Sequence, residues 1–317
     1  MTAEITSSCA YPNLTPTQGV TLFHAQPPTF ANESRFKHRP LPQPSRLRFA
    51  SLPPTKLQMT SSSHPQNVMI IAIGGPTCSG KTTLAKNLQK VLPNSEILHQ
   101  DDFAPNSEEI PIHPVHGVPD WDDPRGAIDW IRLRKTIEQL KNNPEEPLPT
   151  THDNLNTAVD PIELNTEKYA DWIERIAALK LPKRFIILDG FLLYWDQHCV
   201  ENYDLKFFVR ESYEVLKERR RIRQTYHTAD GMTWKDPPGY WDQIIWPAYL
   251  LAHRHMFKEG AVETAALDRD SWAGKDVVLL EPSKGDPGEK TISQFLETTL
   301  KAICDHLQNS PPSSQPA

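Results

Sequence analysis

The 317-residue chain has little of several features that mark common classes of protein. It has only four cysteines, Cys9, Cys78, Cys199 and Cys304, with no CxxC pair, so the sequence predicts neither a disulfide framework nor a zinc site. No run approaches about 18 consecutive apolar residues, so no membrane-spanning helix is predicted. Lys and Arg number 34 against 40 Asp and Glu, a net charge of −6, which argues against a nucleic-acid-binding protein. The chain is nevertheless long enough to bury a substantial core.

Proline, by contrast, is abundant, and its distribution marks where a folded domain begins. Residues 1–67 hold 10 of the 30 prolines and 8 serines, with 6 basic residues and only 2 acids. Because prolines interrupt helices and no periodic apolar segment occurs there, we predict a disordered tail. A mitochondrial targeting segment stays open as an alternative, as does an extension absent from the working protein, since Met59 or Met69 could start a complete domain. We predict a folded domain over 68–308 and a second disordered end over 309–317.

Apolar runs that alternate with amphipathic segments predict an α/β domain. Continuous apolar runs are typical of strands buried on both faces of a parallel sheet. Such strands are expected at 68–73, 95–99, 185–189, 205–209 and 277–280. Helices are expected over 82–92, 127–141, 166–179, 213–223, 241–258 and 291–307, with a loop over 142–165. The alternation predicts a parallel five-stranded sheet with flanking helices.

The turn after the first strand fits a phosphate-binding loop (P-loop). The pattern G-x-x-x-x-G-K-[ST] is matched without a mismatch by Gly75, Pro76, Thr77, Cys78, Ser79, Gly80, Lys81 and Thr82. Backbone N–H groups of such a loop surround a phosphate at the positive end of the next helix. Lys81 is expected to reach the β- and γ-phosphates, and the Thr82 hydroxyl to bind Mg²⁺. The sequence therefore predicts ATP binding over 75–83, which includes Thr83.

The guanine-reading Asn-Lys-x-Asp of a GTPase is absent, which favours a kinase for a small molecule. Such a kinase needs a base for the acceptor hydroxyl and positive charge that closes over the phosphates. Asp101 and Asp102 follow the second strand, at the edge where open α/β sheets bind ligands, so Asp101 is placed to accept a proton or to help hold the metal. Either aspartate could instead cap the next segment. The basic helix 213–223 is expected to form a lid, although a charge run is often only a solvated face.

Five motifs together resemble the nicotinamide riboside kinase family over roughly 68–308. They are GKTTLAKNLQK at 80–90, QDDF at 100–103, DGFLL at 189–193, PGYWD at 238–242 and WPAY at 246–249. The resemblance implies a nucleoside-monophosphate-kinase-like fold with a helical lid. It also implies that the chain makes nicotinamide mononucleotide from nicotinamide riboside and ATP, and accepts nicotinic acid riboside as well.

The resemblance also implies roles for single residues. On the catalytic and nucleotide side, Asp101 takes the position of the family's base near Mg²⁺, Thr82 that of the metal-binding hydroxyl, and Arg220 and Lys284 lie near the nucleotide. On the substrate side, Asp122 and Arg221 are implied at the ribose. The wider substrate set is Asp101, Asp102, Phe103, Trp121, Asp122, Arg221 and Tyr226.

Trp121 and Tyr226 are implied to sandwich the pyridinium ring of the substrate. A fixed positive charge suits two aromatic faces, by about 0.5 to 2 kcal/mol each. For each of these residues a structural role stays open: Trp121 as simple packing, Tyr226 as a surface residue and Asp122 as a helix N-cap.

The chain departs from the family pattern at three places. Asp189 stands where the family often has Glu, one methylene longer, and 142–183 and 227–236 are longer than expected. Two other interpretations remain. One is a uridine or cytidine kinase, or another small-metabolite kinase of the same fold, and the other is a non-catalytic ATP-binding regulator. We expect no membrane, nucleic-acid or obligate protein partner, and a cytoplasmic location with nuclear access left open.

Overall fold

The computed structural model of the chain describes residues 67–149, 164–179, 182, 184–223, 225–228, 230–283, 285–286 and 288–309. Nearly all of the predicted tail 1–67 therefore lies outside the described residues, as do Lys284, much of the predicted loop 142–165 and residues 310–317. No helix among the described residues is both long and apolar enough to cross a membrane.

A five-stranded sheet with the order β2-β3-β1-β4-β7 forms the centre of the domain, and all of its neighbouring strands are parallel. The strands are β1 (Val68–Gly74), β2 (Ser95–His99), β3 (Arg184–Gly190), β4 (Leu205–Val209) and β7 (Val277–Leu280). Every residue of β1 and β3 is buried, because these two strands lie inside the sheet and both of its faces are covered. The predicted parallel five-stranded sheet is confirmed.

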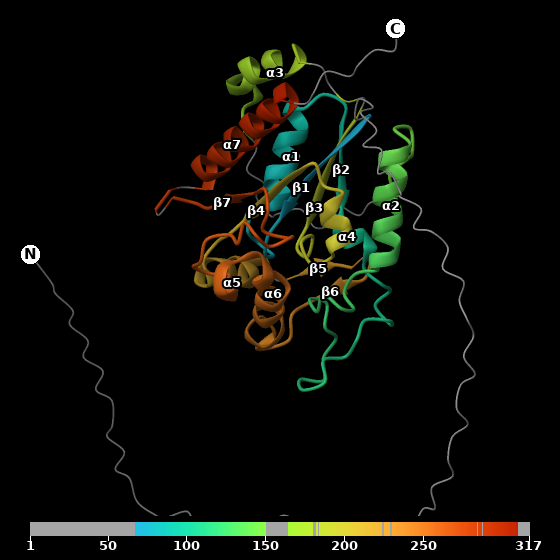
Figure 1. Cartoon of the computed structure of the whole chain (residues 1–317). Helices are drawn as coiled ribbons and strands as arrows, with labels where there is room; N and C mark the ends of the chain where they lie inside the picture. The colour runs from blue at the N-terminus through green and yellow to red at the C-terminus, as the bar shows by residue number, and fades with distance from the viewer. Residues whose placement is uncertain are drawn as a thin grey trace, which may run out of the picture. The chain divides into compact units, whose positions relative to one another are not determined.

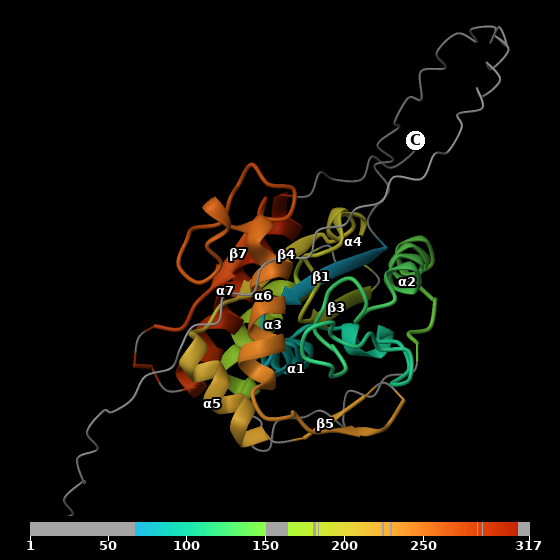
Figure 2. The same cartoon turned by 90° about the horizontal axis from the view of Figure 1, so that it is seen from below.

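Helices cover both faces of this sheet (Figures 1 and 2). One face packs against α1 (Lys81–Val91), α3 (Ala170–Ala177) and α7 (Gly288–Asn309). The other packs against α2 (Trp130–Asn142), α4 (Gln197–Glu201) and α6 (Trp246–His253). Successive residues of β1 alternate between the two cores: Ile71 packs with the α1 side and Ile70 with the α2 side. The apolar runs in the sequence thus supply two cores at once.

The predicted helices differ from the observed ones mainly at their ends. The helix expected from 127 begins at Trp130, because the Asp129 side chain accepts the N–H of Arg132 and caps the first turn. The helix expected over 241–258 is divided: residues 241–245 form wider π-helical turns, Pro247 lies in the first turn of α6, and the α-helix ends at His253. The short helix α4 and a hairpin of β5 (Tyr226–His227) and β6 (Thr233–Trp234) were not predicted.

The carboxyl ends of the central strands meet at one edge of the sheet, as they must when strands are parallel. The P-loop follows β1, Asp101 lies just after β2, and Asp189 is near the end of β3. The helix α5 (Tyr213–Arg223) and the β5–β6 hairpin lie at this same end of the domain (Figure 1). Segments more than a hundred residues apart in sequence therefore surround one space.

Candidate active site

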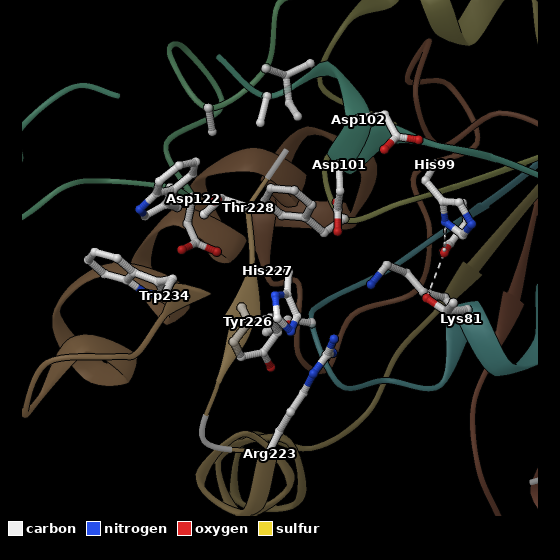
Figure 3. Close-up of a pocket in the computed structure, with 18 of the residues that line it drawn as sticks. Lys81, His99, Asp101, Asp102, Asp122, Arg223, Tyr226, His227, Thr228 and Trp234 are labelled. Carbon is white, nitrogen blue, oxygen red and sulfur yellow. Dashed lines mark hydrogen bonds and ion pairs between the residues drawn. The ribbon is translucent and has the colours of Figure 1, made fainter. Parts of the chain in front are cut away.

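A cavity of about 140 Å³ lies at this edge of the sheet. Its walls come from the P-loop and α1, the ends of β2 and β3, the loop before α2, and α5 with the β5–β6 hairpin (Figure 3). The lining includes Thr77, Lys81, Thr82, His99, Asp101, Asp102, Trp121, Asp122, Asp189, Phe191, Arg220, Arg223, Tyr226, Thr228 and Trp234. The structure therefore brings together half of the residues that the sequence singled out: Thr77, Lys81, Thr82, Asp101, Asp102, Trp121, Asp122, Arg220 and Tyr226.

The P-loop has the backbone that a phosphate cradle requires. Gly75 has φ +145°, and a Cβ there would lie 2.4 Å from the carbonyl oxygen of Val209, so only glycine fits. Gly80, with φ +94°, turns the chain into α1, whose first turn carries Lys81 and Thr82. The buried hydroxyl of Ser79 has no hydrogen-bond partner in the described part of the chain. Backbone N–H groups and this hydroxyl are thus arranged around the start of a helix, where an anion binds well.

Asp101 and Lys81 point toward one another across the cavity (Figure 3). Asp101 remains open to solvent through the cavity, yet the surrounding walls desolvate it. Desolvation raises the pKa of its carboxyl, and although the charge of Lys81 acts in the opposite direction, the net shift is upward. A carboxylate of raised pKa is a stronger proton acceptor than an ordinary aspartate. This is the property that a catalytic base needs.

Asp189 is the centre of a hydrogen-bonded group at the base of the cavity. The Thr82 hydroxyl donates to Asp189 Oδ2 over 2.7 Å, and His99 Nδ1 lies 3.1 Å from the same oxygen. Burial lowers the pKa of His99, but its hydrogen bond with Asp189 and the charges of Asp189, Asp101 and Asp102 together outweigh burial, and the net shift is upward. Burial raises the pKa of Asp189, while the hydrogen bonds from His99 and Thr82 and the charges of Lys81 and His99 together lower it by more. Both directions favour an ion pair between the two side chains.

These residues fit a magnesium ion that arrives with a nucleotide. Among the described residues, no three or more His, Cys, Asp or Glu side chains are grouped to hold a metal ion on their own. Mg²⁺ at a nucleotide usually takes only one or two protein ligands, and phosphates and water complete the shell. Asp189 Oδ1 is buried without a hydrogen-bond partner in the part of the chain described, beside the P-loop hydroxyl of Thr82. A P-loop hydroxyl and a strand-end carboxylate form the usual donor set.

Asp122 occupies the opposite end of the cavity, where it is only 9% exposed. Asp120 positions it, because the Asp120 side chain accepts the N–H groups of Asp122 and Asp123. Desolvation raises the pKa of Asp122 to about 7; Arg220 opposes this shift, and Asp120 and other nearby carboxylates add to it. A carboxyl group that titrates near neutral pH therefore faces the space opposite the P-loop.

Arg220 connects the lid helix to both sides of the site. It donates to both oxygens of Asp236 over 2.7 and 2.8 Å, and to Thr77 Oγ1 over 3.1 Å. Burial lowers the pKa of Arg220, but the hydrogen bonds to Asp236 and the nearby acidic groups, Asp236 and Asp122 among them, together raise it by more, so its charge is fixed. The neighbouring Arg219 donates to the carbonyl of Cys78. The P-loop is thus already in contact with basic residues of α5.

The aromatic walls differ from the expected pair. Trp121 faces Trp234 of β6, with ring centroids 6.1 Å apart and planes inclined by 57°. Tyr226 also lines the cavity, but the guanidinium carbons of Arg220 and Arg223 lie 3.5 and 4.1 Å from its ring centroid. The Tyr226 hydroxyl is also 3.3 Å from Cys78 Sγ. In this structure Tyr226 is engaged by arginines, and the ring opposite Trp121 is Trp234.

Two predicted substrate residues do not lie in the cavity. Phe103 is 1% exposed and packs in the core on the α2 side, so only its neighbours Asp101 and Asp102 face the site. Arg221 is exposed and forms an ion pair with Glu218. On a helix Arg220 and Arg223 share a face because they are three residues apart, whereas Arg221 is turned about 100° from Arg220. Lys284 lies outside the described residues.

The predicted site residues did not include His99, Asp189, Arg223 and Trp234. Asp189 drew notice in the sequence as the first residue of the DGFLL motif and as a departure from the family pattern, but it was given no role. His99 directly precedes the QDDF motif, which could have drawn attention to it. Its partner, however, depends on which strand lies next to β2. Trp234 falls in the stretch 227–236 that is longer than expected, and its role depends on the fold of that stretch.

The class of protein follows from three features of the site. A P-loop follows the first strand of a parallel sheet, a carboxylate faces the P-loop lysine, and the cavity extends beyond them toward Asp122. These features define a phosphotransferase that acts on a small molecule. Relatives of known name give the family. The chain is 31% identical over 258 residues to the nicotinamide riboside kinase of Saccharomyces cerevisiae, covering 76% of this chain and 99% of that protein. It is 30% identical over 245 residues to that of Schizosaccharomyces pombe, covering 75% of this chain and 99% of that protein.

Mammalian proteins are similar as well. The match to nicotinamide riboside kinase 2 of Homo sapiens is 28% identical over 245 residues, 77% of this chain and 86% of that protein. A scan against protein-family models gave no match. From the two yeast relatives, the chain belongs to the nicotinamide riboside kinase family.

Proposed function

We propose that the chain transfers the γ-phosphate of ATP to the 5′-hydroxyl of nicotinamide riboside, which yields nicotinamide mononucleotide for NAD salvage. Membership of the nicotinamide riboside kinase family supports the substrate class. The observation that carries the proposal is the order of groups along one cavity: Lys81 of the P-loop, then Asp101, then the carboxyl of Asp122 with Trp121 and Trp234.

The chemistry follows from this order. The 5′-oxygen forms a bond to the γ-phosphorus while the bond from that phosphorus to the β–γ bridging oxygen breaks, and ADP leaves. Asp101 accepts the proton of the attacking hydroxyl, a role favoured by its raised pKa. Lys81 and Arg223, both of which line the cavity, balance the charge on the phosphoryl group during transfer.

We propose that Thr82 and Asp189 hold Mg²⁺ together with the phosphates, and that Asp101 lies near it. The ion, when bound, neutralises charge on the β- and γ-phosphate oxygens. The Thr82 hydroxyl and Asp189 Oδ2 lie 2.7 Å apart, so the two proposed ligands are close to one another.

At the acceptor end, we propose that Asp122 accepts hydrogen bonds from the ribose hydroxyls and that Trp121 and Trp234 form the aromatic wall against the pyridinium ring. We place Trp234 opposite Trp121 because the Tyr226 ring is already covered by guanidinium groups. A cation between two indoles gains about 0.5 to 2 kcal/mol from each ring. Nicotinic acid riboside has the same charged ring and is a proposed second substrate.

The experiment is a coupled ATP-consumption assay on the full chain, with nicotinamide riboside, nicotinic acid riboside, uridine and cytidine in parallel. Asp101→Asn is the control for the base. Turnover of the pyridine ribosides that the variant loses supports the proposal. Preference for uridine or cytidine would replace the substrate and keep the kinase, whereas ATP binding without turnover of any acceptor would point to a regulator.

A further inference from the structure

His99 is a buried histidine that the proposed chemistry does not use. It is the last residue of β2, and in the parallel pairing of β2 with β3 its direct neighbour is Asp189. The two side chains are 9% and 5% exposed, and the Nδ1–Oδ2 distance is 3.1 Å. Figure 3 shows the row of contacts from His99 through the carboxylate to α1.

The two contacts at Asp189 fall on the same oxygen. Oδ2 is 3.1 Å from His99 Nδ1 and 2.7 Å from the Thr82 hydroxyl, while Oδ1 has no hydrogen-bond partner among the residues described. The last torsion of an aspartate side chain is broad and nearly two-fold, so by itself it does not distinguish the two oxygens. Because His99 and Thr82 both contact Oδ2, they fix that torsion, and Oδ1 takes part in neither hydrogen bond.

The contact also connects two segments with different tasks. Asp101 lies two residues after His99, and Asp189 belongs to the next strand of the sheet. A hydrogen bond between His99 and Asp189 therefore holds the strand end that leads to the proposed base against the strand that carries the proposed metal ligand. Both His99 and Asp189 line the cavity, so this connection is part of its wall.

We propose that His99 is a positioning residue for phosphoryl transfer. Its Nδ1–H donates to Asp189 Oδ2, sets the orientation of that carboxylate and leaves Oδ1 available to the metal of the nucleotide. This inference rests on the proposed function, in which Asp189 and Thr82 receive Mg²⁺. His99 itself touches neither metal nor substrate.

The test compares three substitutions in the full chain. His99→Leu removes the donor and keeps much of the volume. His99→Asn places an amide nitrogen near the position of Nδ1, whereas His99→Gln places it near that of Nε2. Mn²⁺ binding in the presence of ADP is measured by electron paramagnetic resonance, and the Mg²⁺ dependence of turnover is measured alongside the KM for the nucleoside.

Loss of a residue that orients a metal ligand typically weakens metal binding by about 10- to 100-fold. We expect that loss for His99→Leu and His99→Gln, near-normal Mn²⁺ affinity for His99→Asn, and an unchanged KM for the nucleoside in all three. Equal Mn²⁺ affinity in the wild type and His99→Gln would overturn the proposal, and so would an Asn variant as weak as the Gln variant. If the Leu variant fails to fold, the comparison of the Asn and Gln variants still tests whether a donor at the position of Nδ1 supports Mn²⁺ binding.

The outcome is separable from that of the proposed function. Mn²⁺ and ADP bind without any acceptor, so the comparison reports on His99 even if the wild type phosphorylates none of the pyridine ribosides. Conversely, full turnover of nicotinamide riboside together with wild-type Mn²⁺ affinity in all three variants would keep the function and reject the role of His99.

Discussion

The raised pKa of Asp122 predicts that this carboxyl, which we propose binds the ribose, destabilises the folded chain at high pH. The pKa of this group rises from 3.8 to about 7, mainly because the side chain is desolvated. The folded state therefore keeps a proton that the unfolded state has lost over the intervening pH range. The stability associated with this group is fully present below pH 3.8, falls as pH rises, and reaches its lowest level above about pH 7.

The magnitude follows from the size of the shift. One pKa unit corresponds to about 1.36 kcal/mol, so the full shift is worth at most about 4 kcal/mol, and the part that develops between about pH 5 and about pH 8 is roughly 3 kcal/mol. Asp122→Asn removes the ionisation and keeps the shape of the side chain. The free energy of unfolding of the variant, relative to the wild type, should thus be larger at about pH 8 than at about pH 5 by roughly 3 kcal/mol.

Urea denaturation of both chains at the two pH values measures this difference. Asp123→Asn is the matched control: burial tends to raise the pKa of Asp123, but its hydrogen bonds with Arg125 lower it below 3.8, so it stays ionised at both pH values. The free energy of unfolding of the control should differ from that of the wild type by the same amount at both pH values. If Asp122→Asn behaves like the control, Asp122 is ionised in the folded chain at the lower pH and the reasoning is refuted.

Three further outcomes are expected. Asp101→Asn should lower kcat by about 10²- to 10⁴-fold while nucleotide affinity, measured by titration, stays within a few-fold; a kcat near that of the wild type would exclude Asp101 as the base. Trp234→Ala should raise the KM for nicotinamide riboside by about 2- to 30-fold, and Tyr226→Phe should change it little; the reverse pattern would restore Tyr226 as the second wall. Below about pH 7, binding of nicotinamide riboside should release protons from Asp122, and calorimetry in buffers of different ionisation enthalpy measures that release; equal proton release with uridine would contradict the assignment.

Local patterns in the sequence were sufficient for the strands and the phosphate side. The apolar runs predicted β1 and β3 to within one residue at each end, because a strand that is buried on both faces is apolar at nearly every position. The P-loop is a contiguous motif, so the spacing of the motif was enough to identify Gly75, Lys81 and Thr82. The disordered tail over 1–67, the domain boundaries and the cytoplasmic location stay predictions.

The contacts between segments that are distant in the sequence could not be predicted in the same way, because they depend on the tertiary fold. The contact of His99 with Asp189 requires that β2 lie next to β3, an order set by the packing of the whole sheet. Which arginine of the run in α5 faces the cavity depends on the rotation of that helix about its axis. Trp234 reaches Trp121 only because the longer stretch 227–236 folds into a hairpin. In each case the sequence shows the type of residue, but only the fold shows which side chain it contacts.

The proposed arrangement of charges along the cavity predicts that it favours a charged ring over a neutral base. In the proposed arrangement Lys81 and Arg223 face the phosphates, and within the described residues the cation that acts on Asp122, Arg220, is shared with Asp236. The raised pKa of Asp122 reflects desolvation that this shared cation does not offset. A pyridinium ring brings the missing positive charge, whereas uracil or cytosine does not, although the ribose is the same. We therefore propose that a cationic nucleoside compensates the desolvation that disfavours an ionised Asp122, and that selectivity arises from the same burial that lowers stability.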